Sequence, residues 1–335
     1  MRAIRVEEGK AAVAEVPDPQ PERDQALVRI TAAGVCHSDL HILHGDWHGV
    51  TTASLGHEAI GVVEALGPGA ERFTQVGQRV ILGLGGAGGA YWCGACEFCL
   101  RGRTRHCIHT ESVMGTFAEK FAIWAPALVP LPDEVPDSEA ALACGGLTAY
   151  AAVKKLVAQG ITPGSSVAII GAAGGLGHYA TQIATAFGYE VTGVDVGADR
   201  LEFVRSLGAA RAVEPGDAEA SSVDAVPVFA ARLSGFELGL QMVRPCGLFV
   251  AVGIPPTSEG PLSLDMFSFF YKEPTLMYSA VGTVEDMREL IELAARGKVK
   301  THIGRTGGLS ELPAIFEELQ AGAYLGRAVI DNLAG

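Results

Sequence analysis

The stretch 167-VAIIGAAGGLG-177 decides the fold of one half of this 335-residue chain. Its first four residues are apolar and predict a buried parallel strand, and the glycines after them predict a tight turn into a helix. Such a turn presents backbone N–H groups at the positive end of a helix, where they bind a pyrophosphate. The stretch therefore predicts a dinucleotide site built on Gly171, Gly174, Gly175 and Gly177.

The next predicted strand, residues 190–195, ends in a carboxylate that bears on the choice of coenzyme. Asp195 follows Gly177 by 18 residues, the place where an acid accepts hydrogen bonds from an adenosine ribose. It would repel a 2′-phosphate, which favours NAD over NADP. Arg200, five residues on, would instead attract that phosphate. The alternative for both is an ordinary acid at a strand end and a solvated helix residue.

Strands and helices alternate on both sides of the glycine stretch. A predicted helix, residues 138–148, precedes it, and predicted helices 175–187 and 200–207 and strands 223–229 and 248–253 follow. The first 135 residues are rich in Gly and Pro and contain short β-type runs at 26–30, 60–64 and 79–82. A helix at 284–296 and a strand at 327–331 are predicted near the end. The fold class is α/β, with a mostly-β part before a doubly wound parallel sheet.

Four cysteines at short spacing form the strongest local motif. Cys93, Cys96, Cys99 and Cys107 lie within fifteen residues, and four thiolates from one loop can close a tetrahedral shell. A closed shell leaves no position for substrate, so the motif predicts a structural zinc. Cysteines that only pack in a core are the alternative, and four of them in so short a segment are improbable as core residues.

A second possible ligand set is dispersed along the chain. Cys36, His57 and Cys144 provide two thiolates and an imidazole, which leave one tetrahedral position open for a reacting oxygen. Taken singly, Cys144 is more often a buried core thiol and His57 more often a structural histidine.

Composition excludes several classes of partner. The net charge of −13 would repel nucleic acid and anionic lipid. Residues 156–189 contain no Asp, Glu, Lys or Arg, but Gly and Pro interrupt this stretch, so a buried strand and helix are expected instead of a membrane span. The charged first ten residues provide no secretory signal, which predicts a cytoplasmic protein and metal-binding, not disulfide-bonded, cysteines.

With these residues assembled, the chain resembles the zinc-containing medium-chain alcohol dehydrogenases, in particular a microbial branch with short subunits. The resemblance covers essentially the whole chain. It is carried by the segments 34-GVCHSDLH-41, 56-GHE-58, 144-CGGLTAY-150 and 326-GRAV-329, together with the four-cysteine segment and the glycine stretch.

The resemblance implies roles for residues around the dispersed ligand set. Cys36, His57 and Cys144 would hold a catalytic zinc, and Glu58 would approach the metal during ligand exchange. Asp39 would accept a hydrogen bond from the imidazole of His57 and fix its tautomer.

The resemblance also implies a proton relay and a set of coenzyme contacts. Ser38 stands in the position of the relay hydroxyl, and His41 in that of the base that passes the proton to solvent. Further coenzyme contacts are expected from His37, Thr148, Leu176, Val252 and Arg327. Six other histidines, at positions 44, 48, 106, 109, 178 and 302, have no predicted role, and Cys246 is expected to be an unligated thiol.

The domain organisation implied by the resemblance has three segments. Residues 1–145 would form a GroES-like catalytic domain with the zinc lobe at about 93–107, residues 146–279 a Rossmann NAD-binding domain, and residues 280–335 a return segment that completes the catalytic domain. A homotetramer is expected, with a homodimer as the alternative. Gly88 and Gly89 stand where relatives usually have a bulky aromatic residue, so the substrate pocket would be wider, or filled by Tyr91 and Trp92.

The implied activity is reversible oxidation of a primary or secondary alcohol to an aldehyde or ketone, with hydride transfer to NAD and two zinc ions per subunit. The nearest alternative is a polyol-directed or aldehyde-directed zinc dehydrogenase or carbonyl reductase of the same superfamily. A zinc-free quinone reductase is disfavoured by the cysteines. A zinc-ribbon protein that binds nucleic acid is disfavoured by the acidic charge.

Overall fold

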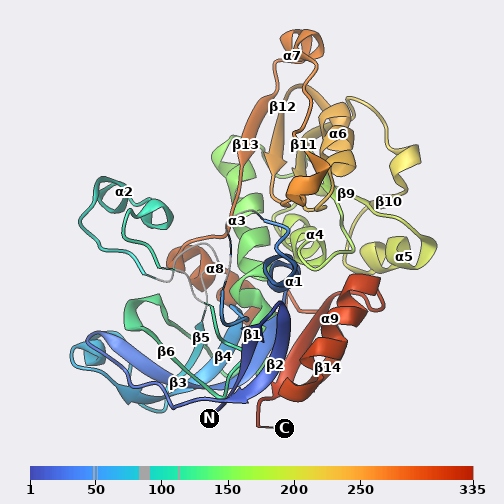
Figure 1. Cartoon of the computed structure of the whole chain (residues 1–335). Helices are drawn as coiled ribbons and strands as arrows, with labels where there is room; N and C mark the ends of the chain where they lie inside the picture. Colours follow the sequence, from blue (N-terminus) through green and yellow to red (C-terminus); the bar gives the residue numbers. More distant parts are fainter. Residues whose placement is uncertain (48–49, 51, 83–90, 112–113, 335) are drawn as a thin grey trace. The chain divides into compact units, whose positions relative to one another are not determined.

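The computed structural model describes residues 1–47, 50, 52–82, 91–111 and 114–334. Their contacts divide the chain into two compact units, and each is described by itself (Figure 1). Unit 1 comprises residues 1–147 and 281–335, and unit 2 comprises residues 148–280. Helix α3, Gly145–Ala158, begins in unit 1 and continues in unit 2.

A parallel sheet forms the centre of unit 2. Its strand order is β10-β9-β8-β11-β12-β13. From the centre, β8 to β10 follow one another toward one edge and β11 to β13 toward the other, as in a doubly wound Rossmann sheet. All pairings are parallel. The strands are β8 (Ser166–Ile170), β9 (Glu190–Val194), β10 (Arg211–Val213), β11 (Val223–Val228), β12 (Val243–Ala251) and β13 (Thr275–Tyr278). The predicted α/β class is confirmed.

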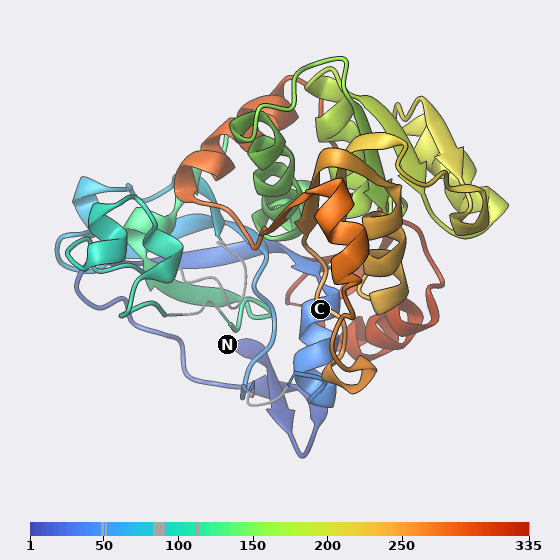
Figure 2. The ribbon, with the colours of Figure 1, turned by 90° about the horizontal axis from the view of Figure 1, so that it is seen from above.

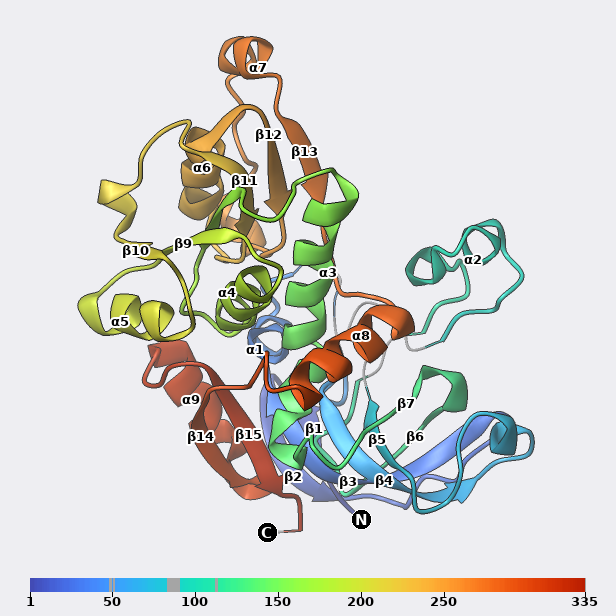
Figure 3. The ribbon, with the colours of Figure 1, turned by 180° about the vertical axis from the view of Figure 1, so that it is seen from behind.

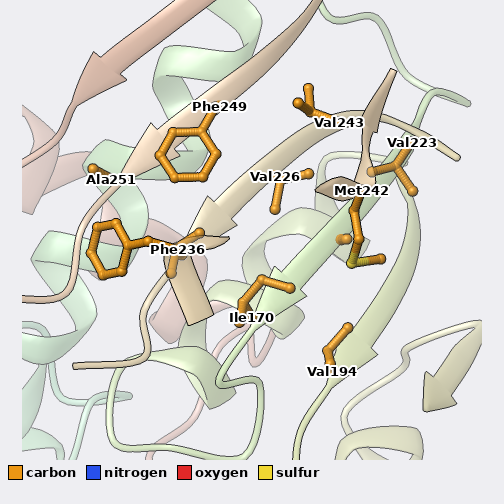
Figure 4. Packing of buried hydrophobic residues seen from close by; sticks show 11 residues of the cluster. Ile170, Val194, Val223, Val226, Phe236, Met242, Val243, Phe249 and Ala251 are labelled. Carbon is orange, nitrogen blue, oxygen red and sulfur yellow. The ribbon is translucent and has the colours of Figure 1, made fainter. Parts of the chain in front are cut away.

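Apolar side chains pack helices against this sheet. Phe236 of α6 and Phe249 of β12 lie 6.2 Å apart between ring centroids, within a buried cluster that also contains Ile170 and Val226 (Figure 4). Besides α3, unit 2 contains the helices α4 (Gly177–Ala186), α5 (Ala198–Ser206), α6 (Leu233–Met242) and α7 (Met266–Lys272), with 3-10 helices η6 (Pro215–Asp217) and η7 (Thr257–Glu259).

The quoted glycine stretch folds as the predicted strand, turn and helix. Gly171, directly after β8, has φ of 80°, a conformation that favours glycine. A Cβ on Gly177 would lie 1.9 Å from the Gly171 carbonyl oxygen, so the start of α4 can pack on the turn only without a side chain there. Helix α4 begins at Gly177, two residues after the expected start at Gly175.

Unit 1 is built around a mostly antiparallel seven-stranded sheet and a separate hairpin of β1 and β2 (Figure 2). The first 135 residues were expected to be mostly β with long loops, and strands β1 to β7 lie within them. The return segment adds two strands, which pair in parallel with each other. The strands are β1 (Arg2–Glu7), β2 (Lys10–Glu15), β3 (Gln25–Val35), β4 (Ala59–Leu66), β5 (Arg79–Leu82), β6 (Lys120–Trp124), β7 (Val129–Pro130), β14 (Ile303–Gly308) and β15 (Arg327–Asn332).

Short helices cover the sheet of unit 1. Helix α9 packs on β14 at the end formed by the return segment, as Figure 3 shows. The α-helices are α1 (His37–His44), α2 (Glu97–Leu100), α8 (Val284–Ala295) and α9 (Leu312–Ala321). The 3-10 helices are η1 (Ala70–Arg72), η3 (Thr104–His106), η4 (Ala125–Ala127), η5 (Asp137–Ala143) and η8 (Leu309–Glu311).

The expected helix at 138–148 is wrong in one respect, because it is broken at Cys144. The 3-10 helix η5 ends at Ala143, Cys144 has φ −127° and ψ −61°, and α3 starts at Gly145. The Gly145 N–H donates to Glu58 Oε1 at 3.1 Å, which stabilises the new helix start. Among the described residues no single helix is long and apolar enough to cross a bilayer; η5 and α3 pass this test only together, at an angle of 51°.

Candidate metal centres and coenzyme loop

Three elements of unit 1 bring the dispersed ligand set together. The sulfur, ring nitrogen and carboxylate atoms of Cys36, His57, Glu58 and Cys144 all lie within 4.8 Å of one another, and all four residues are buried. Cys36 lies between β3 and α1, His57 and Glu58 directly precede β4, and Cys144 occupies the break between η5 and α3. Residues 108 positions apart in the sequence therefore meet at one point.

Asp39 fixes the orientation of two of these groups. Its Oδ1 accepts hydrogen bonds from His57 Nδ1 at 3.2 Å and from the Gly56 N–H at 2.9 Å, and its Oδ2 accepts one from the Cys36 N–H at 3.2 Å. Asp39 is fully buried. Although burial lowers the pKa of His57, the Asp39 carboxylate raises it well above its usual value. Because Asp39 binds Nδ1, Nε2 is the nitrogen of His57 that can bind a metal ion.

Glu58 forms a buried ion pair with Arg327 of β15. The Arg327 guanidinium binds Glu58 Oε2 and donates to the Val35 carbonyl oxygen at 2.9 Å. Burial raises the pKa of Glu58 to about 7, and Arg327 opposes this rise. A Cβ on Gly34 would lie 2.2 Å from Glu58 Oε2, so this position must be glycine for the carboxylate to fit. Arg327 was expected to contact a coenzyme, and the structure shows its guanidinium on Glu58.

The donor set of this centre fits a metal ion. Asp39 binds the His57 ring at Nδ1. The other ring nitrogen, the buried Nε2, has no hydrogen-bond partner among the described residues. A hydrogen bond from the Cys144 thiol lowers the pKa of Cys36, and the same contact raises that of Cys144. Two thiols that share one proton beside an imidazole suit a soft divalent cation that replaces this proton. Two sulfurs and one nitrogen are a zinc-type set with one coordination position left over.

The four-cysteine segment forms a second cluster, around α2 and η3. The sulfur atoms of Cys93, Cys96, Cys99 and Cys107 lie within 4.8 Å of one another. Backbone amides point at these sulfurs, since the Cys93 N–H donates to Cys107 Sγ at 3.2 Å and the Cys96 N–H to Cys93 Sγ at 3.3 Å. These donors stabilise thiolates, the form in which cysteine binds metal.

Electrostatics in this cluster also favour a cation. Backbone amides of Cys99 and Ile108 lower the pKa of Cys96 to about 6, whereas burial and the neighbouring Cys96 raise the pKa of Cys99 to about 12. Four adjacent thiolates repel one another, so all four ionise together only around a positive ion. With four sulfurs the coordination is complete, and the cluster suits a structural metal.

Helix α1 carries the residues expected to form the relay. Ser38 Oγ lies 3.6 Å from Cys36 Sγ, and the exposed His37 precedes it. His41, one turn on, has two partners that the sequence analysis missed. Its Nδ1 lies 2.8 Å from Asp46 Oδ2, and its ring stacks on Trp47 with centroids 4.9 Å apart.

A turn at the end of α1 creates this contact. Gly45 has φ of 70° and ends the helix, and the Asp46 N–H then donates back to the His41 carbonyl oxygen at 2.9 Å. This hydrogen bond is the one that defines a Schellman motif, and it brings Asp46 next to the last turn of α1. The signal was present in the sequence as a glycine directly after the helix.

The glycine turn of unit 2 is held by the predicted acid. Asp195 Oδ2 accepts a hydrogen bond from the Ala173 N–H at 2.8 Å, and Oδ1 accepts one from the Val196 N–H at 2.9 Å. Arg200 lies 3.7 Å from the same carboxylate. Asp195 thus reaches across from β9 to the turn after β8.

The other predicted coenzyme residues of unit 2 come from helix α3, from the glycine turn and from the residue after strand β12. Thr148 and Val252 are buried, and Leu176 directly precedes α4. His178 had no predicted role, yet it is fully buried and its Nδ1 lies 3.2 Å from the Gly174 carbonyl oxygen. Gly88 and Gly89, on which the expectation of a wider pocket depends, lie outside the described residues.

Comparison with known proteins agrees with this geometry. Residues 22–133 match the family described as "Alcohol dehydrogenase GroES-like domain", and residues 175–296 match "Zinc-binding dehydrogenase". An alcohol dehydrogenase of Geobacillus stearothermophilus is 37% identical over 351 residues, which cover 98% of this chain and 99% of that protein.

Solved structures of similar proteins cover the whole chain as well. The alcohol dehydrogenase of Aeropyrum pernix has a TM-score of 0.88 at 29% identity, over 98% of this chain and 99% of that one. Acetophenone reductase of Geotrichum candidum, solved with NAD, has a TM-score of 0.85 at 29% identity, over 99% and 96%. A cobalt- and zinc-bound alcohol dehydrogenase of Pyrobaculum aerophilum has a TM-score of 0.87 at 25% identity, over 98% and 99%.

The two clusters predict two zinc ions per chain. Replacing one ligand of a cluster leaves too few donors for tight binding, so Cys144→Ser and Cys99→Ser are each expected to retain about one ion per chain instead of two. Elemental analysis of the purified variants measures this. Cys246→Ser, which removes an exposed free thiol, is the control and should retain both ions. If the wild-type protein contains only one zinc ion per chain, or none, the assignment of one or both metal centres is wrong.

Proposed function

Because the chain belongs to the zinc-containing alcohol dehydrogenases, we propose that it catalyses reversible oxidation of a primary or secondary alcohol to an aldehyde or ketone, with NAD as hydride acceptor. The observation that carries this proposal is the buried Cys36, His57 and Cys144 set, whose imidazole Nε2 has no hydrogen-bond partner among the described residues. Three donors suit a catalytic ion, and four suit a structural one.

Each part of the reaction has residues to support it. Bound zinc would make the alcohol hydroxyl more acidic, and NAD would accept the hydride. Cys36, His57 and Cys144 would hold the catalytic ion, with Glu58 adjacent, while Asp39 keeps His57 in the ligating tautomer. Oxidation also releases one proton. Ser38 would accept it from the alcohol, and His41 would deliver it to solvent.

Coenzyme binding is assigned to the Rossmann segment, residues 146–279. The glycine turn after β8 lies at the carboxyl end of the strand where the sheet order reverses, which is the usual ligand position in such sheets. Asp195 supports NAD over NADP, because its carboxylate would repel a 2′-phosphate. Catalysis is assigned to residues 1–145 and 280–335. The remaining contacts proposed for the coenzyme are His37, Thr148, Gly171, Gly174, Gly175, Leu176, Gly177, Arg200, Val252 and Arg327.

We also propose that the protein works as a homo-oligomer in the cytoplasm. Helix α7 projects from the end of unit 2 (Figure 1), and its Met266, Phe267, Phe270 and Tyr271 are each about 70% exposed, from 68% to 73%. The neighbouring strand β13 ends the sheet order, and such edge strands readily pair with another chain. The cytoplasmic location is supported by the cysteines, because all seven are free thiols and metal-binding clusters require reduced cysteines.

The activity is tested by following the absorbance of reduced coenzyme with primary, secondary and aromatic alcohols. NAD is expected to support turnover at least about 10-fold better than NADP, because of the charge of Asp195. Polyols and aldehydes in the same panel test the nearest alternative activity. Lack of turnover with all alcohols by zinc-loaded protein would contradict the proposal.

Ser38→Ala is expected to lower kcat for alcohol oxidation by about 100-fold or more, because it removes the first proton acceptor. Ser38→Thr keeps the hydroxyl and serves as the matched control, with kcat close to wild type. Zinc content should stay at two ions in both variants. An unchanged rate in Ser38→Ala would eliminate the relay assignment.

Phe270→Asp should shift the protein to a smaller species in light scattering coupled to size exclusion, because it places a charge on the exposed face of α7. Val76→Asp changes a residue of unit 1 that is 61% exposed and should leave the assembly unchanged. If both variants have the mass of the wild type, α7 is not part of the interface.

A further inference from the structure

We propose that Asp46 is a positioning residue for the proton relay, holding His41 in one tautomer and one orientation, with Trp47 as the stacking support of the ring. This inference rests on the proposed function, in which His41 receives the proton released by alcohol oxidation. Neither Asp46 nor Trp47 was expected from the sequence to take part. They follow helix α1 directly and reach His41 only through the turn at Gly45.

The contact between the two side chains is short and shielded. Asp46 Oδ2 lies 2.8 Å from His41 Nδ1, and the His41 side chain is 14% exposed and that of Asp46 35% exposed. The backbone holds the same pair together, since the Asp46 N–H donates to the His41 carbonyl oxygen at 2.9 Å. Two hydrogen bonds between the same two residues leave the carboxylate little freedom relative to the ring.

The chemistry of this contact determines which nitrogen is the base. A carboxylate only accepts hydrogen bonds, so Nδ1 of His41 must carry a hydrogen. The lone pair of the neutral ring is then on Nε2, and this nitrogen can accept a proton. Without Asp46, both tautomers would be populated, and only one of them has a basic Nε2.

Trp47 supports the same ring from its face. The two rings are tilted by only 29° with centroids 4.9 Å apart, an arrangement in which an indole stabilises a cation lying over it. The ring of His37, a second titratable group, lies 6.3 Å from that of His41 between centroids. His41 is thus held at its ring edge by the Asp46 carboxylate and on its face by the Trp47 indole.

The proton balance is simple. Each alcohol oxidised delivers one hydride to NAD and one proton to the relay. In our proposal Nε2 of His41 takes up this proton, Asp46 remains ionised throughout, and the imidazolium returns the proton to water before the next turnover. Asp46 therefore acts only through His41, which makes the assignment testable.

A double-mutant cycle provides the test. Asp46→Asn is expected to lower kcat by about 10-fold or more, with the KM for alcohol and the Kd for NAD changed less than about 2-fold. His41→Gln should lower kcat by at least as much. In the His41→Gln background, Asp46→Asn should have no further effect, because the residue through which it acts is gone. Asp133→Asn, at a fully exposed carboxylate of unit 1, is the control and should retain wild-type kinetics.

Each other outcome overturns a defined part of the argument. If Asp46→Asn lowers kcat equally in both backgrounds, or raises KM and lowers the thermal midpoint instead, Asp46 has a structural role and the inference fails while the relay stands. If His41→Gln has no effect on kcat, the relay itself fails, and the inference with it. Asp46→Ser provides a second variant if Asp46→Asn does not fold.

Discussion

The buried ion pair between Glu58 and Arg327 constrains how unit 1 can be built. Glu58 lies beside two thiols without solvent, and an unpaired carboxylate there would be strongly unfavourable. Arg327 provides the compensating charge, but it comes from β15, almost at the end of the chain. The chain must therefore return to unit 1 after completing unit 2. The returning chain forms the parallel strands β14 and β15, and β15 pairs with β3 of the first segment.

Local patterns in the sequence were sufficient for much of this architecture. The apolar run before Gly171 predicts β8, and the glycines after it predict the turn, because both follow from short-range sterics and burial. The spacing of the four cysteines likewise predicts their cluster, since one loop supplies every ligand. For Cys36, His57 and Cys144 the residues alone left core packing open, and only the resemblance to a family joined them.

Other features depended on contacts that no local pattern contains. At the break at Cys144 the Gly145 N–H donates to Glu58, 87 residues away, and no local pattern shows this contact, so a helix was expected to continue through Cys144. The ion pair of Arg327 with Glu58 was not predicted either, because the two residues are 269 positions apart. The pairing of His41 with Asp46 falls outside helical periodicity, since a left-handed residue separates the two. In each case the deciding partner was distant in sequence or reached by a turn.

The two carboxylates around helix α1 perform the same task for different imidazoles. Asp39 binds Nδ1 of His57 and Asp46 binds Nδ1 of His41, so in the neutral form of each ring the lone pair lies on Nε2. Their burial differs, however. Asp39 is fully buried beside a ring whose Nε2 is suited to a metal ion, where no proton has to leave. Asp46 is 35% exposed, and in the proposed relay its histidine exchanges a proton with water in every turnover. The exposure of each acid thus matches the role proposed for its histidine, a metal ligand directly before β4 for His57 and a base on α1 for His41.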